Sequence, residues 1–420
     1  MRQSRLFTKT KKEVPTDEIS KNAELLIRGG FIHKEMAGVY DYLPLGLRVL
    51  KKIENIIREE MNAIGGQEVL MTTLQNPEIW KKSNRWDEAV VDNWFKSKLI
   101  SGGDVGIANT HEEPITDMLT HFIHSYKDLP VYVYQFQTKF RNELRAKSGI
   151  MRVKEFLMKD LYSFNKNEEE FKKFYEQCAE AYLNIFKKIG IGHITYRTLA
   201  SGGSFTSGFT DEFQTISSVG EDTIYIDEEK GLAINKEIYN DENLIKYGFN
   251  KVAMKEEKAI EVGNIFPLGT KYSDALSLSY LDEKGEKQKI IMGSYGIGLG
   301  RLLGTVVEVL SDDKGIIWPE SIAPFAVHLL ALGEDENVQK EANKIYEDLV
   351  KNNIEVLFDD RNSISPGEKF ADADLLGIPL RIVVSTRSLK ENGVEIKKRT
   401  EEKGKIISLD ELLTLLKAKS

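Results

Sequence analysis

Charged and aromatic side chains gather along one predicted β-hairpin, at a spacing that could bind a phosphorylated ligand. Two runs rich in β-branched and aromatic residues, 131–143 and 151–164, are separated by a short polar stretch. Because side chains alternate between the faces of a strand, Arg141 and Glu143 should share one face at the end of the first run. The returning run should present four side chains on one face, which are Arg152, Phe156, Met158 and Asp160.

This set of side chains has two interpretations. A guanidinium beside a carboxylate is suited to a phosphate with its bound metal ion, and a nearby aromatic ring can stack on a purine. The same residues could also form an ordinary cross-strand salt bridge over a sheet. The hairpin alone leaves both interpretations open.

A glycine-rich run, MGSYGIGLGR, is the second candidate for anion binding. Its glycines, at positions 293, 296, 298 and 300, fall between a predicted strand and an apolar helix that Arg301 opens. Missing side chains let a ligand approach the backbone, and a helix N-terminus with an arginine favours an anion. The run matches neither the dinucleotide fingerprint GxGxxG nor a phosphate loop of the form GxxxxGKS or GxxxxGKT. A close-packed strand-to-helix turn without a ligand explains it equally well.

The segment Thr110-His111-Glu112-Glu113 precedes Pro114 and an apolar helical run. Thr110 and Glu113 fit a capping box, and proline is common in the first turn of a helix. That arrangement would leave Glu112 without a structural role and free to accept hydrogen bonds from a cation. The capping and binding interpretations both stay open at this point.

The sequence argues against several other kinds of chemistry. Cys178 is the single cysteine, which excludes a disulfide framework and favours a reducing compartment, with the cytoplasm as the default. Its place on an apolar helical face predicts a core thiol. His121 and His124 have near-ligand spacing without a third ligand, and no GxSxG nucleophile motif occurs. The N-terminus lacks an apolar signal region and no run approaches 18 apolar residues, so we expect neither secretion nor membrane spanning.

The elements that must hold these residues are of mixed type. A length of 420 residues predicts two or three domains, and the net charge of -8 excludes a uniformly basic nucleic-acid coat. Apolar residues at steps of three and four predict amphipathic helices over 47–64 and 166–189. We expect the strands in the middle of the chain to pair mainly with strands that are neighbours in sequence. After two prolines in 317–324, alternating strands and helices predict a separate α/β domain of about 95 residues, with a boundary near residue 320.

Taken in order, these segments resemble a class II aminoacyl-tRNA synthetase, and specifically a prolyl-tRNA synthetase of bacterial type, over nearly the whole chain. FRNE with the returning strand is similar to the second motif of that class, and GSYGIGLGR to the third. THEE is similar to the substrate loop of the prolyl enzymes, EVGNIFPLGTKYSDA to the segment before motif 3, and GIIWPESIAPF to the junction with the anticodon-binding domain. The three motifs would span about 44–74, 131–164 and 290–310.

The resemblance implies an α+β catalytic domain over 1–320, in which an antiparallel β-sheet is flanked by helices, and an α/β anticodon-binding domain over 321–420. It also implies a homodimer that uses ATP and Mg²⁺ and binds L-proline and tRNA(Pro). The proline carboxylate would attack the ATP α-phosphate to give prolyl-adenylate and pyrophosphate, and the prolyl group would then pass to the 3′ end of the tRNA. Positioning and charge neutralisation carry such a reaction, so no protein nucleophile is needed.

The resemblance also assigns roles to particular residues. The catalytic residues would be Arg141 on the α-phosphate, Glu143 on magnesium and Arg301 on the γ-phosphate. The residues in contact with ATP would be Arg141, Glu143, Arg152, Phe156 under the adenine, Gln214 and Arg301. The residues in contact with proline would be Thr110 and Glu112 at the ammonium, Arg141, Phe156, Met158, Gly203 and Gly293. The residues in contact with tRNA would be Arg361, Lys397, Lys398 and Arg399.

The chain departs from the family pattern in four places. Thr72 replaces the proline that commonly ends motif 1, and Asp211 and Asn264 stand where histidines are common. Only about 40 residues separate Glu221 from Glu261, which leaves no room for the large editing insertion of the usual bacterial enzyme. Because a proline pocket can admit the smaller alanine, we expect that mischarged alanyl-tRNA is not cleared in cis. That task would fall to a separate trans-editing protein, if one exists.

Two other identities stay open. One is a sister class II enzyme for threonine or serine, although the chain has no Cys/His zinc set of the threonyl kind. The other is a synthetase-like RNA-binding or regulatory protein without catalysis. Such proteins tend to lose the phosphate-binding arginines, whereas Arg141, Arg152 and Arg301 are present here.

Overall fold

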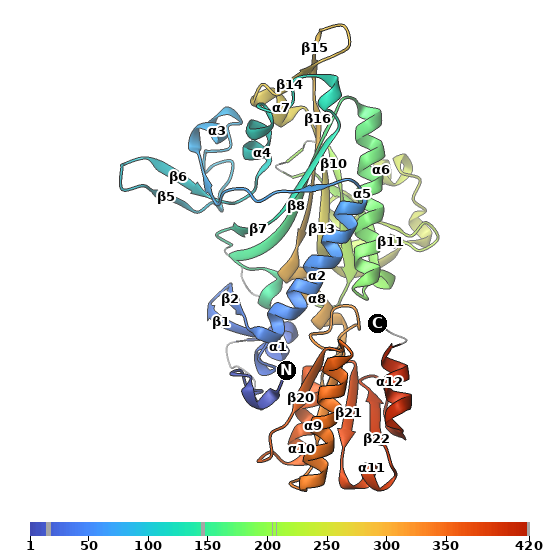
Figure 1. The fold of residues 1–420 in the computed structure, drawn as a ribbon. Helices are drawn as coiled ribbons and strands as arrows, with labels where there is room; N and C mark the ends of the chain where they lie inside the picture. The colour runs from blue at the N-terminus through green and yellow to red at the C-terminus, as the bar shows by residue number, and fades with distance from the viewer. Residues whose placement is uncertain (14–17, 144–147, 204, 207, 418–420) are drawn as a thin grey trace. The chain divides into compact units, whose positions relative to one another are not determined.

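The computed structural model describes residues 1–13, 18–143, 148–203, 205–206 and 208–417 (Figure 1). The chain forms two compact units, each built from segments that are separate in sequence. The larger unit comprises 36–39 and 53–305, and the smaller unit comprises 1–35, 40–52 and 306–420. Within the described part of the chain, none of the helices has the length and apolar character needed to cross a membrane.

The larger unit is organised around a nine-stranded sheet with the order β10-β9-β12-β11-β13-β16-β8-β7-β3. Its strands are β3 (Gln67–Glu68), β7 (Val131–Phe140), β8 (Glu155–Asn165), β9 (Thr195–Ser201), β10 (Phe209–Ile216), β11 (Asp222–Asp227), β12 (Leu232–Asn235), β13 (Lys255–Gly269) and β16 (Ile291–Gly298). Neighbouring strands are antiparallel except for the β3–β7 and β9–β12 pairs. Because β10 also pairs with β13, strands β9 to β13 close into a ring.

Strands β7 and β8 form the antiparallel hairpin that the sequence predicts, with Gln137 opposite Met158. Part of the expected tip, 144–147, lies outside the described residues. Strand β7 ends at Phe140, so the prediction that Arg141 and Glu143 alternate along a strand is wrong.

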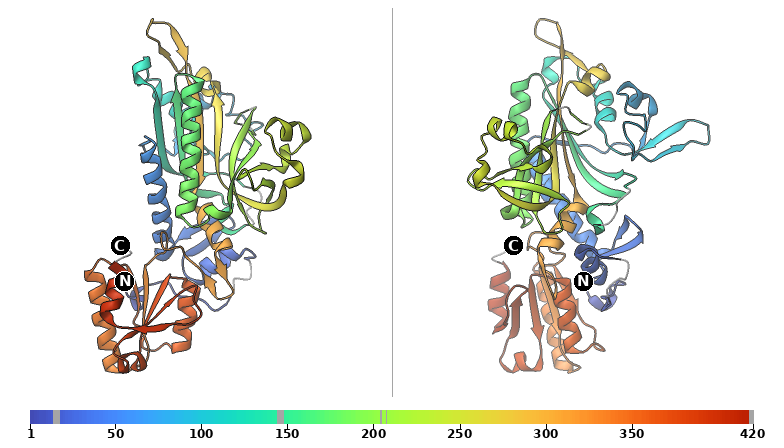
Figure 2. Two further views of the ribbon diagram at one scale, coloured as in Figure 1. Left: turned by 90° about the vertical axis from the view of Figure 1, so that its right-hand side faces the viewer. Right: turned by 180° about the vertical axis from the view of Figure 1, so that it is seen from behind.

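Helix α5 (Glu168–Lys188) packs along one face of this sheet (Figure 2). It begins after Asn167, whose side chain accepts a hydrogen bond from the Glu170 backbone N–H at 2.9 Å. Its buried face includes Phe174, Cys178 and Tyr182. Burial raises the pKa of the Cys178 thiol to about 12, which agrees with the predicted core thiol.

The glycine-rich run differs from its prediction. Strand β16 passes directly into α8 (Leu299–Val309), so Gly293, Gly296 and Gly298 lie within a strand and not in a turn. Arg301 is the third residue of α8. The strand-to-helix turn, one of the two interpretations of this run, is therefore wrong, because Gly293 and Gly296 are paired with both β8 and β13 and Gly298 is paired with β8.

Shorter elements complete the larger unit. Its helices are α3 (Pro77–Lys82), α4 (Glu112–Leu119), α6 (Asp241–Lys246) and α7 (Lys271–Ala275). Its other strands are β4 (Leu74–Gln75), β5 (Lys96–Lys98) and β6 (Asp104–Ile107), which form a three-stranded sheet, and β14 (Ser279–Leu281) with β15 (Lys287–Lys289). The helix predicted over 47–64 is confirmed as α2 (Pro44–Ala63).

The smaller unit contains a five-stranded sheet with the order β20-β19-β21-β22-β23. Its strands are β19 (Val327–Ala331), β20 (Val356–Asp359) and β21 (Leu380–Val384), which are parallel, and β22 (Val394–Lys398) and β23 (Lys405–Ile407), which add antiparallel pairs. The accompanying helices are α9 (Glu336–Lys351), α10 (Pro366–Leu376), α11 (Thr386–Lys390) and α12 (Leu409–Lys417). The alternation predicted after residue 320 is confirmed. Elsewhere the chain forms α1 (Lys21–Arg28), β1 (Ile32–Met36), β2 (Val39–Tyr42), β17 (Ser311–Asp312) and β18 (Gly315–Ile316).

The first residues of the chain join the C-terminal sheet within the smaller unit. Arg2 forms a parallel bridge to Phe358, and the Met1 ammonium donates a hydrogen bond to the Val356 carbonyl at 2.7 Å. The Arg2 guanidinium also pairs with Asp360 at 3.3 Å. The sequence pattern gave no sign of this pairing, and the expected domain limits at residues 320 and 321 stay a prediction.

Candidate active site

The larger unit contains a cavity of about 240 Å³, to which β8 and β16 present alternate side chains. Eight residues expected to bind ATP or proline line it, namely Thr110, Glu112, Arg141, Glu143, Arg152, Phe156, Met158 and Arg301. Its walls also include Asp160, Tyr162, Phe205, Glu261, Asn264 and Ser294. The fold thus brings segments that are far apart in sequence to one enclosed space.

The apolar floor of the cavity is formed by side chains that alternate along strand β8. Phe156, Met158 and Asp160 all line the cavity from β8, which confirms that they share one face. On β16, Gly296 pairs with Asp160 and Gly298 with Met158. A Cβ atom on Gly296 would lie 3.9 Å from Met158 Sδ, so the missing side chain leaves the space above the sheet open to a ligand.

Arg141 extends into the cavity just after β7 ends. Within the described part of the chain, its Nε and Nη2 atoms donate long hydrogen bonds only, both of 3.4 Å, to the Asn109 carbonyl. Its guanidinium carbon lies 5.4 Å from the centre of the Phe156 ring. Burial lowers the pKa of Arg141 and the positive charge of Arg301 lowers it further. An anion that entered this space would relieve both effects.

The other two cavity arginines are paired with carboxylates. Arg152 donates to Glu143 at 3.0 Å and to Glu221 at 2.7 Å. Arg301 donates to Glu261 at 3.0 Å and to the Met151 carbonyl at 3.0 Å. About a third of each arginine side chain is exposed, 36% in both cases, so these groups remain accessible from the cavity.

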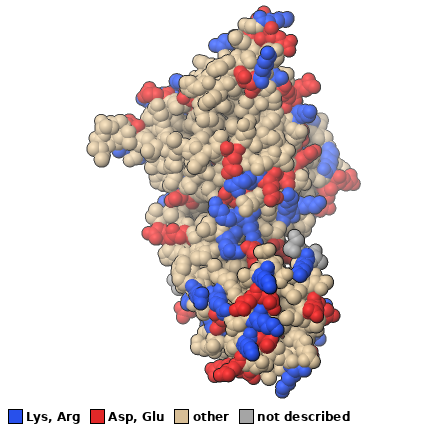
Figure 3. Space-filling view, in the orientation of Figure 1, with Lys and Arg blue, Asp and Glu red and all other residues tan. Residues whose placement is uncertain are grey.

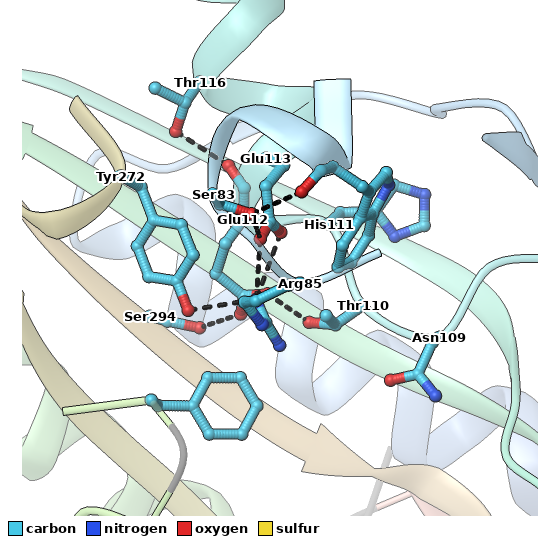
Figure 4. Close-up of polar contacts among 12 residues, drawn as sticks. Ser83, Arg85, Asn109, Thr110, His111, Glu112, Glu113, Thr116, Tyr272 and Ser294 are labelled. Atoms are coloured by element: carbon cyan, nitrogen blue, oxygen red, sulfur yellow. Dashed lines mark hydrogen bonds and ion pairs between the residues drawn. The ribbon is translucent and has the colours of Figure 1, made fainter. Parts of the chain in front are cut away.

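The predicted capping box at Thr110 and Glu113 is wrong (Figure 4). Helix α4 begins at Glu112, and its N-cap is His111, whose side chain makes no capping hydrogen bond. The Thr110 hydroxyl instead donates to Glu112 at 2.5 Å, and the Ser294 hydroxyl donates to the same carboxylate at 3.0 Å. Glu112 therefore has hydrogen-bond partners, contrary to expectation, yet it still lines the cavity as the binding interpretation requires.

A buried polar network supports the cavity from beneath. Lys139, fully buried, donates to His111 Nδ1 at 2.7 Å and to Asp160 at 2.9 Å. The Tyr162 hydroxyl donates to the same Asp160 oxygen at 2.9 Å. Because Nδ1 of His111 accepts, its Nε2–H donates to the Thr72 carbonyl at 3.1 Å. Thr72 thus anchors the segment before α4 through its backbone carbonyl.

Three of the expected site residues do not line the cavity. Gly293 lies on the opposite face of β16, where a Cβ atom would meet Tyr295 and Phe171. Gln214 is fully buried and donates hydrogen bonds to Glu212 and Asp222, both at 2.8 Å. Gly203 lies between β9 and β10 with a positive φ of 53°. Their predicted roles in ligand binding stay predictions.

The residues expected to bind tRNA have different surroundings in the smaller unit. Arg361 donates to Asp359 and Asp372, and Arg399 donates to Asp312, in ion pairs of 2.6 to 2.8 Å. Lys397 is half-buried and Lys398 is exposed at the end of β22. On the face drawn in Figure 3, Lys and Arg alternate with Asp and Glu over the C-terminal residues.

Some cavity residues could have been found from sequence. Ser294 stands two residues before Gly296 within the glycine-rich run, and Glu261 heads the segment before motif 3. Lys139 precedes Arg141 by two positions, so period-two spacing pointed to it. Arg85, which contacts Glu113 beneath the substrate loop, had no signal because it is an isolated arginine between short elements.

Comparison with known protein families agrees with this geometry. The family described as the tRNA synthetase class II core domain, for G, H, P, S and T, matches residues 95–310. The family described as the anticodon binding domain matches residues 326–419. The sheet, the cavity and these matches together define the core of a class II aminoacyl-tRNA synthetase, with the predicted fold class confirmed.

Comparison with individual relatives identifies the family within this class. The proline–tRNA ligase of Rickettsia africae is 40% identical over 98% of this chain and 99% of its own length. That of Anaplasma phagocytophilum is 36% identical over 99% of both chains. The Giardia lamblia prolyl-tRNA synthetase, solved in complex with prolyl-adenylate, shares the fold with a TM-score of 0.74 at 19% identity, over 93% of this chain and 74% of its own. The chain belongs to the proline–tRNA ligase family.

Proposed function

We propose that this chain activates L-proline with ATP to form prolyl-adenylate and pyrophosphate, and then transfers the prolyl group to the 3′ end of tRNA(Pro). The observation that carries the proposal is the charge layout of the cavity. An anionic carboxylate, Glu112, lines the same space as three guanidinium groups, those of Arg141, Arg152 and Arg301. A zwitterionic amino acid beside a triphosphate needs this combination of charges.

Proline would bind at the Glu112 end of the cavity. Glu112 is held by the Thr110 and Ser294 hydroxyls, so its oxygens have a fixed direction in which to accept the secondary ammonium. Met158 and Phe156 line the floor beside it and suit the apolar ring carbons. The carboxylate of proline would then lie toward Arg141.

The triphosphate would bind among the arginines. Arg141 makes only long hydrogen bonds to the residues that the structure describes, which favours its use on the α-phosphate, and its neighbour Phe156 offers a ring for the adenine. Arg301 and Arg152 would exchange carboxylate partners for phosphate oxygens. The reaction is an in-line displacement at phosphorus, in which positioning and charge neutralisation lower the barrier and no protein nucleophile takes part.

The residues present fit a magnesium ion at the phosphates. Mg²⁺ prefers hard oxygen ligands, and Glu143 supplies a carboxylate on the cavity wall next to Arg152. Glu143 is therefore the residue that would hold the ion. When bound, Mg²⁺ supplies neutralisation of charge on the phosphate oxygens.

Several further features belong to the same proposal. We place the catalytic domain within 1–320 and the anticodon-binding domain within 321–420, and retain Lys397 and Lys398 as tRNA contacts because Arg361 and Arg399 are in ion pairs. A homodimer, a cytoplasmic location and a separate trans-editing protein stay predictions. The prediction of a separate trans-editing protein is supported by the short segment between Glu221 and Glu261, which forms β11, β12 and α6.

Exchange of labelled pyrophosphate into ATP, measured with each of the twenty amino acids, tests the proposed function. We expect proline to support exchange and Arg141→Ala to reduce it by about 100-fold or more, because a charge-assisted contact to the α-phosphate is lost. Arg387→Ala, which removes an exposed arginine of the smaller unit, is the matched control and should retain full exchange. Exchange with threonine or serine alone, or with no amino acid, would contradict the proposal.

A further inference from the structure

Two adjacent carboxylates, Glu112 and Glu113, are both buried at the start of α4, with side chains 2% and 0% exposed. Glu112 lines the cavity, whereas Glu113 does not. A single guanidinium, that of Arg85, lies within ion-pair distance of both. The division of this one positive charge between the two carboxylates determines how much negative charge Glu112 presents to the cavity.

Arg85 is not shared equally between the two carboxylates. Its Nη1 donates to both oxygens of Glu113, at 3.0 and 3.1 Å, and to the Tyr272 hydroxyl at 3.0 Å. The same nitrogen lies 3.7 Å from Glu112 Oε2, a distance that brings the charges together without a hydrogen bond. Ser83 adds a hydrogen bond to Glu113 at 2.7 Å (Figure 4).

The surroundings keep the guanidinium in this position. Its central carbon lies 5.2 Å from the ring centres of Trp80 and Phe205 and 5.5 Å from that of Tyr272. Other cations face the pair from neighbouring elements, since Lys271 of α7 donates to the Phe205 carbonyl at 3.2 Å, and Lys139 and Arg141 lie beyond Glu112. Among the described residues, neither Lys139 nor Arg141 donates a hydrogen bond to Glu112.

We propose that Glu113 and Tyr272 keep Arg85 at 3.7 Å from Glu112, where it makes no hydrogen bond to that carboxylate, so that Glu112 can still accept the secondary ammonium of proline. Arg85 and Glu113 are then positioning residues that determine specificity for a cationic amine. Glu112 is hydrogen-bonded by two hydroxyls, which orient it without cancelling its charge. This inference rests on the proposed activation of proline.

The test uses pyrophosphate exchange by the full chain. In Glu113→Gln, Arg85 loses its carboxylate partner and turns to Glu112, so we expect the KM for proline to rise by about 10-fold to 100-fold, as for loss of one charged hydrogen bond. The KM for ATP and kcat should change by less than about threefold, because the phosphate site is untouched. In the double variant Arg85→Met/Glu113→Gln the competing cation is gone, and the KM for proline should return toward the wild-type value.

The rescue distinguishes this role from a merely structural one, in which the double variant would be at least as impaired as Glu113→Gln. Asp117→Asn is the matched control, since it breaks a different ion pair of α4, the one to Lys82 of α3, and should leave the KM for proline unchanged because Asp117 does not line the cavity. If Glu113→Gln does not fold, Tyr272→Phe removes one restraint on Arg85 and should raise the same KM to a smaller extent.

Two outcomes overturn the inference alone. The first is a KM for proline in Glu113→Gln or Tyr272→Phe that equals the wild-type value. The second is a double variant whose KM for proline does not return toward the wild-type value. In both cases the wild-type protein itself must support proline-dependent exchange. A wild-type protein that shows no proline-dependent exchange instead overturns the proposed function together with this inference.

Discussion

Two histidines, His111 and His328, are buried and neutral in the folded chain. Burial lowers the pKa of His328 to about 4, and burial together with the positive charge of Lys139 lowers that of His111 to about 4. In the unfolded chain both would titrate near 6.5. Between these values the unfolded chain binds more protons, so the free energy of unfolding is largest above pH 6.5 and falls as the pH falls toward 4.

His328 allows this titration to be tested away from the cavity. Its Nε2 contacts Gln3 Oε1 at 3.0 Å, and its Nδ1 is buried without a hydrogen-bond partner. Between pH 7.5 and pH 5 we expect this residue to account for a loss of about 2 kcal/mol. Thermal unfolding of His328→Gln should therefore show a shallower decline of Tm over this interval than wild type. An equally steep decline in the variant would count against the assignment.

Predictions about single side chains were confirmed where local backbone geometry alone determines the position of the side chain. Phe156, Met158 and Asp160 share a face because strand geometry alone dictates it. The capping box failed because Thr110 donates to Glu112 and Glu113 pairs with Arg85, and Arg85 lies outside α4, where no local pattern points to it. Burial of a carboxylate requires a cation from elsewhere in the fold, and the identity of that cation depends on tertiary packing.

At the scale of elements, β16 separates two functions on its two faces. Ser294, Gly296 and Gly298 line the cavity, whereas Gly293 faces the aromatic layer below. A Cβ atom on Gly293 would lie 2.4 Å from the Tyr295 hydroxyl oxygen and 2.9 Å from Phe171 Cε2. The strand therefore needs glycine at 293 because a side chain there would clash with aromatic rings. It needs glycine at 296 and 298 because side chains there would take up space in the cavity.

Alanine substitutions separate these two requirements. We expect Gly293→Ala to destabilise the fold by about 1 to 3 kcal/mol through overpacking, with little effect on the KM for proline of the folded fraction. Gly296→Ala places a methyl group in the cavity at an ordinary distance from Met158, so it should raise that KM with little loss of stability. Thermal unfolding and pyrophosphate exchange measure the two effects. A raised KM in Gly293→Ala would favour the predicted proline contact instead.

Elements were predictable from sequence where apolar periodicity was strong. The long helices α2 and α5 and the alternating C-terminal elements are confirmed nearly to their ends. The strand through Gly293 to Gly298 was misassigned because its three glycines weaken any strand pattern, while the pairing with β8 and β13 that stabilises it is long-range. Closure of β9 to β13 into a ring likewise has no local signal.

At the scale of the whole molecule, the net charge of -8 means that any contact with RNA must rely on local groups of cations. Two of the four residues proposed for tRNA are occupied by internal carboxylates, which leaves Lys397 and Lys398 at the end of β22. Sequence spacing showed the basic group but could not show which members were already paired.

Aminoacylation with tRNA tests these two lysines. We expect Lys397→Ala/Lys398→Ala to raise the KM for tRNA and to reduce the slope of log affinity against log salt by about 1 to 2, as two phosphate contacts are lost. Proline-dependent exchange should be unchanged, because it needs no tRNA. Lys340→Ala/Lys344→Ala on α9 removes the same charge from exposed positions and serves as control. Equal effects in both double variants would argue for a general loss of charge only.

The parallel bridge between Arg2 and Phe358 also sets an order of events during synthesis. Arg2 and its ion-pair partner Asp360 are 358 residues apart, so the first residues of the chain leave the ribosome roughly 20 to 70 s before β20 exists. During that time they have no native partner, and the smaller unit can be completed only when translation is almost finished. A ribosome-bound chain truncated before β20 should therefore leave these residues open to proteolysis.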